Sequence, residues 1–282
     1  MSRTTWQGND LSRFGLYQPT GAMAQLLALT RKASASWTGK RSAYFLRSMA
    51  MRALRGRPVD VETFGARMRL YPYNNVCEKR ILFTPQYFDP AERDLLRARM
   101  RPDFAFIDVG ANIGGYSLFV AASAGQRARI LAIEPQPDIF ECLIYNIRQN
   151  PFANIKAIDC AVADRDTEVT LFIDPRNRGE SSMRIVNDEL GGTEIKVPGK
   201  ALATIVREEG FPRIDAMKLD VEGAEDLILE PYFRDAPQGL WPQLLLMEFS
   251  RQLWSVDLPA MLLGLGYRQV LKTRQKATFE RI

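Results

Sequence analysis

One segment limits the possible folds most strongly: an apolar strand, a glycine-rich turn and an apolar helix that follow one another without a gap. FAFIDV at 104–109 has the length and apolarity of a buried strand, GANIGG at 110–115 is the turn, and YSLFVAASA at 116–124 is the helix. A second apolar strand, ARILAIE, follows at 128–134. Strands that alternate with helices in this way predict an open, mostly parallel α/β sheet.

The same alternation continues toward the C-terminus. A helix at 137–147 leads to a third strand at 154–162, and further core strands are predicted at 214–220 and 242–249, with a helix from Gly223 between them. We therefore expect residues 61–282 to form one α/β domain. The other strand-like segments are two extra strands and a hairpin, at 167–174, 193–198 and 267–282.

Residues 1–60 lack this alternation of strands and helices and are expected to form a basic helical extension ahead of that domain. Apolar residues recur at helical spacing in 21–35 and 40–55. Residues 1–20 are polar, contain Gly and Pro, and are predicted to be loose.

Two more elements are expected between the extension and the glycine turn. Alternating apolar residues at 61–74 predict a strand or hairpin. A helix should then begin at Pro90, with Asp89 as its N-cap, and run to about Met100.

Charge also divides the chain, at about residue 101. Residues 1–101 hold 18 Lys and Arg against 7 Asp and Glu, whereas residues 102–282 hold 20 against 26. A basic front suits nucleic acid, an acidic membrane surface or a phosphorylated substrate, and it is also typical of a solvated helical face or of one packed on the acidic remainder. A contact with a second copy or with an acidic partner through residues 1–60 is a further expectation.

The glycine turn fits two kinds of nucleotide ligand. A dinucleotide site needs GxGxxG, which Gly110-x-Asn112-x-x-Gly115 meets only with its middle glycine replaced by asparagine, the residue that best tolerates positive φ. S-adenosylmethionine needs an acidic residue two positions before the first glycine to hold its ammonium group, and Asp108 occupies that position. Glu134, at the end of the next strand, can accept both ribose hydroxyls of either ligand.

Four stretches of the chain match one known family in residues and in order. They are FIDVGANIGGYSLFVA (106–121), AIEPQPDIFECLIYNI (132–147), IDAMKLDVEGAE (214–225) and LLLMEF (244–249). Together they resemble the FkbM-type methyltransferases, a branch of the class I S-adenosylmethionine-dependent enzymes. The resemblance covers about residues 60–250 and does not extend to the basic extension.

The resemblance implies a Rossmann-like sheet of seven strands that ends in an antiparallel hairpin, with S-adenosylmethionine as cofactor. It also implies methyl transfer to an oxygen of a small molecule, such as a sugar, glycolipid or polyketide hydroxyl. In that layout the end of the third strand lies beside the adenine. The expected cofactor-binding residues are Asp108, Gly110, Ala111, Asn112, Gly114, Glu134, Cys160 and Ala161.

The chain has no histidine, so a general base must be a carboxylate, a lysine, a tyrosine or water. Lys218 and Asp220 share one face of a core strand, Glu222 follows in the turn, and Glu248 ends the neighbouring strand. Ligands bind at such strand ends, so these four are the candidate catalytic residues. A carboxylate would deprotonate or orient the acceptor, and Lys218 would keep its neighbours ionised. The same oxygens suit Mg²⁺, although we expect no metal.

Several alternatives remain open from the sequence. A nucleic-acid methyltransferase is supported only by the basic front, since the chain lacks NPPY and DPPY motifs. A non-catalytic subunit with a cofactor fold and an NAD oxidoreductase are the others. The polar 174–192 connection would suit a sugar. An odd count of three cysteines and the lack of an apolar run of ~18 residues indicate a reducing, cytoplasmic location without a membrane span.

Overall fold

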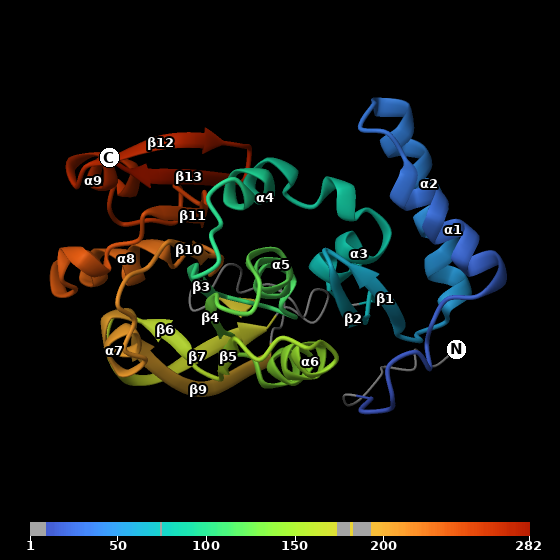
Figure 1. Ribbon diagram of the computed structural model, residues 1–282, viewed down its shortest axis with the longest axis horizontal. Helices are drawn as coiled ribbons and strands as arrows, with labels where there is room; N and C mark the ends of the chain where they lie inside the picture. Colours follow the sequence, from blue (N-terminus) through green and yellow to red (C-terminus); the bar gives the residue numbers. More distant parts are fainter. Residues whose placement is uncertain (1–9, 74, 174–180, 183–192) are drawn as a thin grey trace.

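The computed structural model describes residues 10–73, 75–173, 181–182 and 193–282, and a seven-stranded sheet forms its centre (Figure 1). The strand order is β12-β13-β11-β10-β3-β4-β5. The five strands from β11 to β5 run parallel, and β12–β13 is an antiparallel hairpin paired to β11. The predicted sheet and hairpin are therefore confirmed. The strand bounds are β3 Ala105–Val109, β4 Arg129–Ile133, β5 Ile155–Ile158, β10 Ala216–Leu219, β11 Leu244–Glu248, β12 Tyr267–Lys272 and β13 Lys276–Arg281.

Helices cover both faces of this sheet because the buried strands are apolar on both sides. Phe106 of β3 belongs to the core under α5 and α6, whereas its neighbour Ile107 belongs to the core under α7, α8 and α9. Adjacent residues of one strand thus point to opposite cores. The helices cover the two faces of the sheet and leave the ends of the strands uncovered. The helix bounds are α5 Gly115–Ala124, α6 Pro137–Arg148, α7 Leu202–Glu208, α8 Glu225–Asp235 and α9 Leu258–Gly264, with a short 3-10 turn η3 at Gln238–Leu240.

A second, smaller sheet begins where the chain leaves the edge strand β5. Its order is β6-β9-β7-β8, with β6 parallel to β9 and β7 antiparallel to both β9 and β8. The predicted third strand at 154–162 is therefore two strands in two sheets, separated by Asp159 and Cys160. The strands of this second sheet are β6 Ala161–Ala163, β7 Thr167–Ile173, β8 Ser181–Ser182 and β9 Thr193–Ala201. The rest of the polar 174–192 connection lies outside the described residues.

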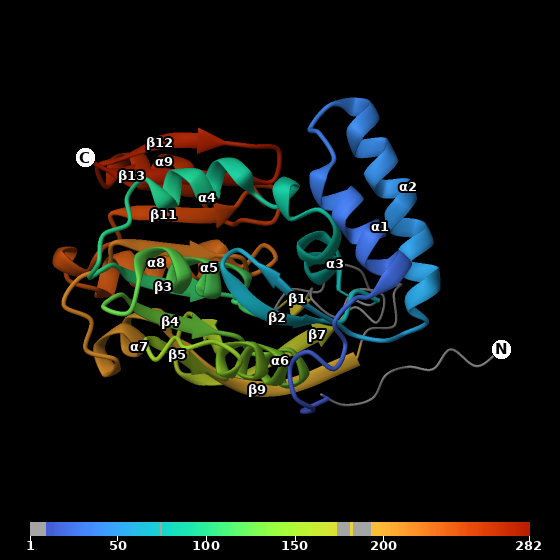
Figure 2. The same cartoon turned by 45° about the vertical axis from the view of Figure 1, so that its right-hand side comes forward.

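The basic extension forms two helices that pack side by side at one end of the molecule (Figures 1 and 2). They are α1 (Gly21–Lys32) and α2 (Trp37–Leu54), close to the predicted bounds. Ser36 caps α2, because its hydroxyl accepts a hydrogen bond from the Gly39 amide at 3.1 Å. The hairpin β1 (Val59–Thr63) and β2 (Ala66–Leu70) connects them to the sheet domain, as expected.

The segment that precedes α1 is held in place, which corrects the prediction that residues 1–20 are loose, as far as residues 10–20 are described. Arg69 of β2 is fully buried, and its guanidinium pairs with Asp60 at 2.7 Å. The same guanidinium donates hydrogen bonds to the backbone carbonyls of Asp10, Ser12 and Arg13. The three contacts with backbone carbonyls join residues more than fifty positions apart, so local composition does not show them.

Three short helical elements precede β3. They are α3 (Val76–Phe83), the 3-10 turn η1 (Pro85–Tyr87) and α4 (Pro90–Arg97), of which only α4 was predicted. Asn75 caps α3 by accepting from the Glu78 amide at 3.1 Å. Over the described ranges, none of the helices has the length and apolarity that crossing a bilayer requires.

Candidate active site

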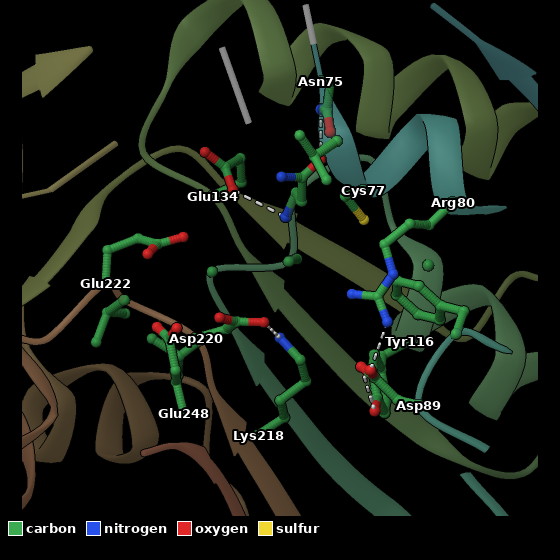
Figure 3. Close-up of a pocket in the computed structure, with 18 of the residues that line it drawn as sticks. Asn75, Cys77, Arg80, Asp89, Tyr116, Glu134, Lys218, Asp220, Glu222 and Glu248 are labelled. Atoms are coloured by element: carbon green, nitrogen blue, oxygen red, sulfur yellow. Dashed lines mark hydrogen bonds and ion pairs between the residues drawn. The ribbon is translucent and has the colours of Figure 1, made fainter. Parts of the chain in front are cut away.

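A cavity of about 520 Å³ lies at the carboxyl ends of the parallel strands, where the sheet edge is free (Figure 3). Its wall combines the ends of β3, β4, β10 and β11, the β5–β6 turn, the β12–β13 hairpin and parts of α2 and α3. Of the twelve site residues predicted from the sequence, all except Asp108 and Gly114 belong to this wall. The sequence therefore located the cavity, and its exceptions have structural causes given below.

The glycine turn forms the floor of the cavity and is pressed against the end of β10. Gly110 has φ +73°, and a Cβ there would lie 2.1 Å from the Asp220 carbonyl oxygen, so no larger residue fits. The amides of Gly110 and Ala111 both donate to the Ile133 carbonyl, at 3.0 and 2.9 Å. Asn112 takes φ +51°, in line with its expected tolerance of positive φ.

Gly114 was predicted to bind the cofactor, which stays a prediction, and it lies one step behind the cavity wall. It is the N-cap of α5 with φ +92°, and a Cβ there would lie 2.8 Å from Leu143 in the core. Gly115 lines the cavity instead. The opposite side of the turn is held by α3, since the Asn75 amide nitrogen donates to the Asn112 side-chain oxygen at 3.0 Å.

Glu134 is a buried carboxylate in the cavity wall, 5% exposed. Its two oxygens accept from the backbone amides of Asn112 and Gln136, at 2.8 and 3.0 Å. Burial raises its pKa to about 7, against the opposing effect of these hydrogen bonds. A ligand that donates two hydroxyl hydrogen bonds would replace the water contacts that the Glu134 carboxylate loses on burial, and would favour its ionised form.

Asp108 is not among the residues that line the cavity, and its contact with a ligand ammonium stays a prediction. Its side chain is fully buried, and one oxygen accepts from the Ser117 amide and hydroxyl at 3.1 and 2.7 Å. The other lies 3.6 Å from the ammonium of Lys218, which is its register partner on β10. Asp108 therefore positions Lys218, because the two side chains stand opposite each other on neighbouring strands.

Asp220 stands at the end of β10 between two lysines. Its carboxylate lies 3.0 Å from the Lys218 ammonium and 3.5 Å from that of Lys276. Burial opposes ionisation of Asp220, but the two lysine charges outweigh it and hold its pKa well below the ordinary range. Asp220 is thus a fixed anion, suited to accept a hydrogen bond and poorly suited to take up a proton.

Glu248, at the end of the adjacent strand β11, has the opposite character. Burial, followed by the charges of Asp220 and Glu225, raises its pKa to about 8. Its Oε2 is buried and, within the described residues, has no hydrogen-bond partner. Figure 3 shows Glu248 and Asp220 together on one side of the pocket with Glu222, which follows β10 at φ +53°.

These three carboxylates are close enough to be considered as cation ligands. One oxygen from each of Asp220, Glu222 and Glu248 lies within 4.8 Å of the others. However, Asp220 already has two ammonium groups beside it, so much of the charge that would attract a divalent ion is balanced. The arrangement therefore resembles an acid–base group more than a metal centre.

Lys276 and Asp89 are site residues that the sequence did not reveal. The Lys276 ammonium lies 2.6 Å from the Asp89 carboxylate and 5.6 Å from the centre of the Tyr116 ring. Asp89 occupies the N-cap position of α4, as predicted, but its side chain accepts no hydrogen bond from that helix. It pairs instead with Lys276 and, at 3.3 Å, with Arg80. No local pattern in the hairpin or before Pro90 indicates these contacts.

The basic extension also contributes to the wall, through Tyr44 and Arg47 of α2. The Arg47 guanidinium stacks on the Tyr44 ring at 4.6 Å, and partial burial lowers its pKa. Arg80 of α3 lies on the same side, across the pocket from the carboxylates (Figure 3). The carboxylates of Asp220, Glu222 and Glu248 thus lie at the strand ends, whereas the guanidinium groups of the wall come from α2 and α3.

The strand order, the glycine turn and the acidic strand end define a Rossmann-like methyltransferase fold of class I. The model of the methyltransferase FkbM domain matches residues 108–267, more than half of the chain. The chain therefore belongs to the FkbM methyltransferase family, and S-adenosylmethionine is its cofactor.

Two curated proteins are similar to parts of this chain. Methyltransferase sdnD of Sordaria araneosa is 30% identical over 152 residues, 44% of this chain and 58% of its own length. The AMB antimetabolite synthetase AmbE of Pseudomonas aeruginosa is 30% identical over 162 residues, 45% of this chain and 8% of its own length. The chain thus spans less than two thirds of either relative.

Among solved structures, the METTL16 methyltransferase domain is similar at 14% identity with a TM-score of 0.46, over 92% of this chain and 91% of that one. At that score, the fold assignment rests on the strand order rather than on this neighbour.

Proposed function

We propose that the chain methylates a hydroxyl oxygen of a small molecule, with Glu248 as the general base. The observation that carries this proposal is the pair of adjacent strand-end carboxylates with opposite character. Lysine charges keep Asp220 ionised, whereas burial raises the pKa of Glu248 to about 8. Neighbouring groups whose pKa values are pushed apart divide acid–base work between them.

The cofactor fits the wall of the cavity. S-adenosylmethionine supplies a methyl group on a positively charged sulfur. Glu134 offers buried carboxylate oxygens to ribose hydroxyls, and the backbone of Gly110 to Asn112 allows close approach because Gly110 has no side chain. Cys160 and Ala161, both buried, offer an apolar edge to the adenine.

The chain's own residues would then handle the acceptor proton. Glu248 in its ionised form takes the hydroxyl proton as the oxygen attacks, and Asp220 accepts a hydrogen bond that orients the acceptor. Lys218 and Lys276 keep Asp220 charged at neutral pH. Holding the acceptor oxygen in line with the methyl group is the other contribution, for which ~7–11 kcal/mol is available from proximity.

A small acceptor is favoured by the limited volume of the cavity and by the relatives. The cavity is about 520 Å³, within the usual range for a small-molecule site. One relative is named an antimetabolite synthetase, a name that points to small-molecule chemistry. We propose a sugar, glycolipid or polyketide hydroxyl as the acceptor group, and a reaction that proceeds without a metal ion.

The proposal is tested by incubating the protein with S-adenosylmethionine labelled in its methyl group and with pools of sugar nucleotides, glycolipids and polyketides. Mass spectrometry and NMR should find the label on an ether oxygen, at a rate unchanged by EDTA. Glu248→Gln should lower the rate about 10²–10⁴-fold, the usual contribution of a general base. Glu230→Gln, at an exposed position of α8, is the matched control.

Other outcomes would overturn parts of the proposal. Label on nitrogen, on carbon or on added RNA would exclude oxygen methylation of a small molecule. A rate lost with EDTA and restored by Mg²⁺ would assign the carboxylates to a metal. Failure to bind S-adenosylmethionine in calorimetry would contradict an active site altogether.

A further inference from the structure

The segment that forms α1 and α2 has an unusual charge composition. Residues 11–59 contain nine Lys and Arg and no Asp or Glu. Neither helix therefore has an acidic residue of its own to balance these cations. A uniformly basic surface of this kind attracts polyanions.

The outer face of α2 adds apolar and aromatic groups to this charge. Trp37 and Phe45 are 71% and 66% exposed, far more than such side chains usually are. Positions 37, 41, 44, 45 and 52 fall on one side of a helix with 3.6 residues per turn. This face consists of Trp37, Arg41, Tyr44, Phe45 and Arg52, all exposed, and we call it the α2 face. Arg41 also stacks on the Trp37 ring at 5.2 Å.

We propose that the α2 face docks the protein on an anionic lipid surface. Exposed aromatic rings among arginines are the combination that an amphipathic helix uses at a membrane interface, where rings enter the headgroup layer and cations meet anionic headgroups. The α1–α2 pair stands at one end of the molecule, so the face is accessible (Figure 2).

Two other occupants fit the observations less well. A nucleic acid would use the arginines, but the aliphatic side chains Leu29 and Met49, exposed by 57% and 47% on the same helix pair, have no role there. A second copy joined through the same face would bring two acid-free basic surfaces together, which repel each other.

The α2 face also borders the cavity. Tyr44 belongs to the α2 face, where it is 46% exposed, and it also lines the cavity wall. Arg47, on the same helix, lines the wall as well. Docking would therefore bring the cavity close to the plane of the headgroups. An acceptor held in that plane would meet Arg47 and Arg80 before it reaches the carboxylates at the sheet edge.

The test is co-sedimentation of the full chain with vesicles, which needs no methyl transfer and so stands apart from the proposed function. Vesicles of phosphatidylcholine with a minority of phosphatidylglycerol should bind the protein, and vesicles of pure phosphatidylcholine should not. Binding should weaken as salt is raised. Circular dichroism and the melting temperature establish that each variant is folded.

Two variants separate the contributions of charge and rings. Arg41→Ala with Arg52→Ala should weaken binding about 25-fold, at about fivefold for each cation near an anionic surface. Trp37→Ser with Phe45→Ser should weaken it at unchanged net charge. The control, Arg127→Ala with Arg148→Ala, removes two exposed cations outside residues 11–59 and should bind like the wild type.

Three results would overturn the proposal. The first is no binding to the anionic vesicles above the neutral baseline. The second is equal loss in the control variant, which would reduce the effect to net charge. The third is a different partner for the α2 face. This would be shown by tight binding to single-stranded RNA that the Trp37 and Phe45 substitutions leave intact, or by a dimer that these substitutions dissociate and that does not bind vesicles.

Discussion

Because the pKa of Glu248 is raised in the folded protein, ionisation of this carboxyl group at high pH should lower the free energy of unfolding by a measurable amount. Its folded-state pKa is about 8, above the ordinary value of 4.5, so the folded chain binds this proton more tightly than the unfolded chain. The stability contribution is fully present below pH ~4.5 and is lost as pH rises through about 8. Glu248→Gln, which keeps the shape and cannot ionise, should therefore become increasingly more stable than the wild type as pH rises.

The magnitude follows from the pKa shift. At 1.36 kcal/mol per pKa unit, integration from 4.5 toward 8 gives an advantage for glutamine of about 1 kcal/mol at pH 5, about 3 at pH 7 and about 5 at pH 9. The rise with pH is the specific signature, since a packing change would shift stability equally at every pH.

Urea unfolding followed by tryptophan fluorescence at these three pH values measures the difference. Glu230→Gln, at an exposed position, should show no such trend. A Glu248→Gln variant that is no more stable than the wild type at pH 9, or whose advantage does not grow with pH, would refute the raised pKa. The general-base assignment would then lose its physical basis.

Three further changes test the rest of the site. Gly110→Ala should abolish S-adenosylmethionine binding in calorimetry and lower the melting temperature, because its Cβ would lie 2.1 Å from the Asp220 carbonyl oxygen. Glu134→Gln should weaken S-adenosylmethionine binding about 10–100-fold, the loss expected for hydrogen bonds to a charged group. Wild-type affinity should rise with pH through about 7 as Glu134 ionises, and a flat profile would contradict that role. Lys276→Met should destabilise folding by about 3–5 kcal/mol, since it leaves Asp89 buried without its nearest cation, and unchanged urea midpoints would contradict this.

The sequence predicted those parts of the fold and site that depend on local pattern. The strand–helix alternation from residue 104 onward located the sheet, and the ends of its strands brought Asp220, Glu222 and Glu248 together. The glycine turn located one wall of the cavity, because positive φ and close approach restrict residue type at Gly110 and Asn112.

What the sequence could not show depends on contacts between distant segments. Asp89 looked like a helix cap because it precedes Pro90, yet its partner Lys276 lies 187 positions away. The spacing of Asp108 from the glycine predicted a ligand contact, but it could not show that the strand register also places Asp108 opposite Lys218. The anchoring of residues 10–13 by Arg69 is a third case, with separations of 56 to 59 positions.

The lysine pair around Asp220 also affects the order in which the molecule can assemble. Lys218 precedes Asp220 by two residues on β10, but Lys276 comes from β13, 56 positions further along. In a folding intermediate in which the β12–β13 hairpin has not yet paired with β11, Lys276 is absent from the site. In that intermediate Asp89 and Asp220 lack one ammonium group, and each has to remain hydrated or protonated. Addition of the hairpin therefore brings one ammonium group to both carboxylates in a single event.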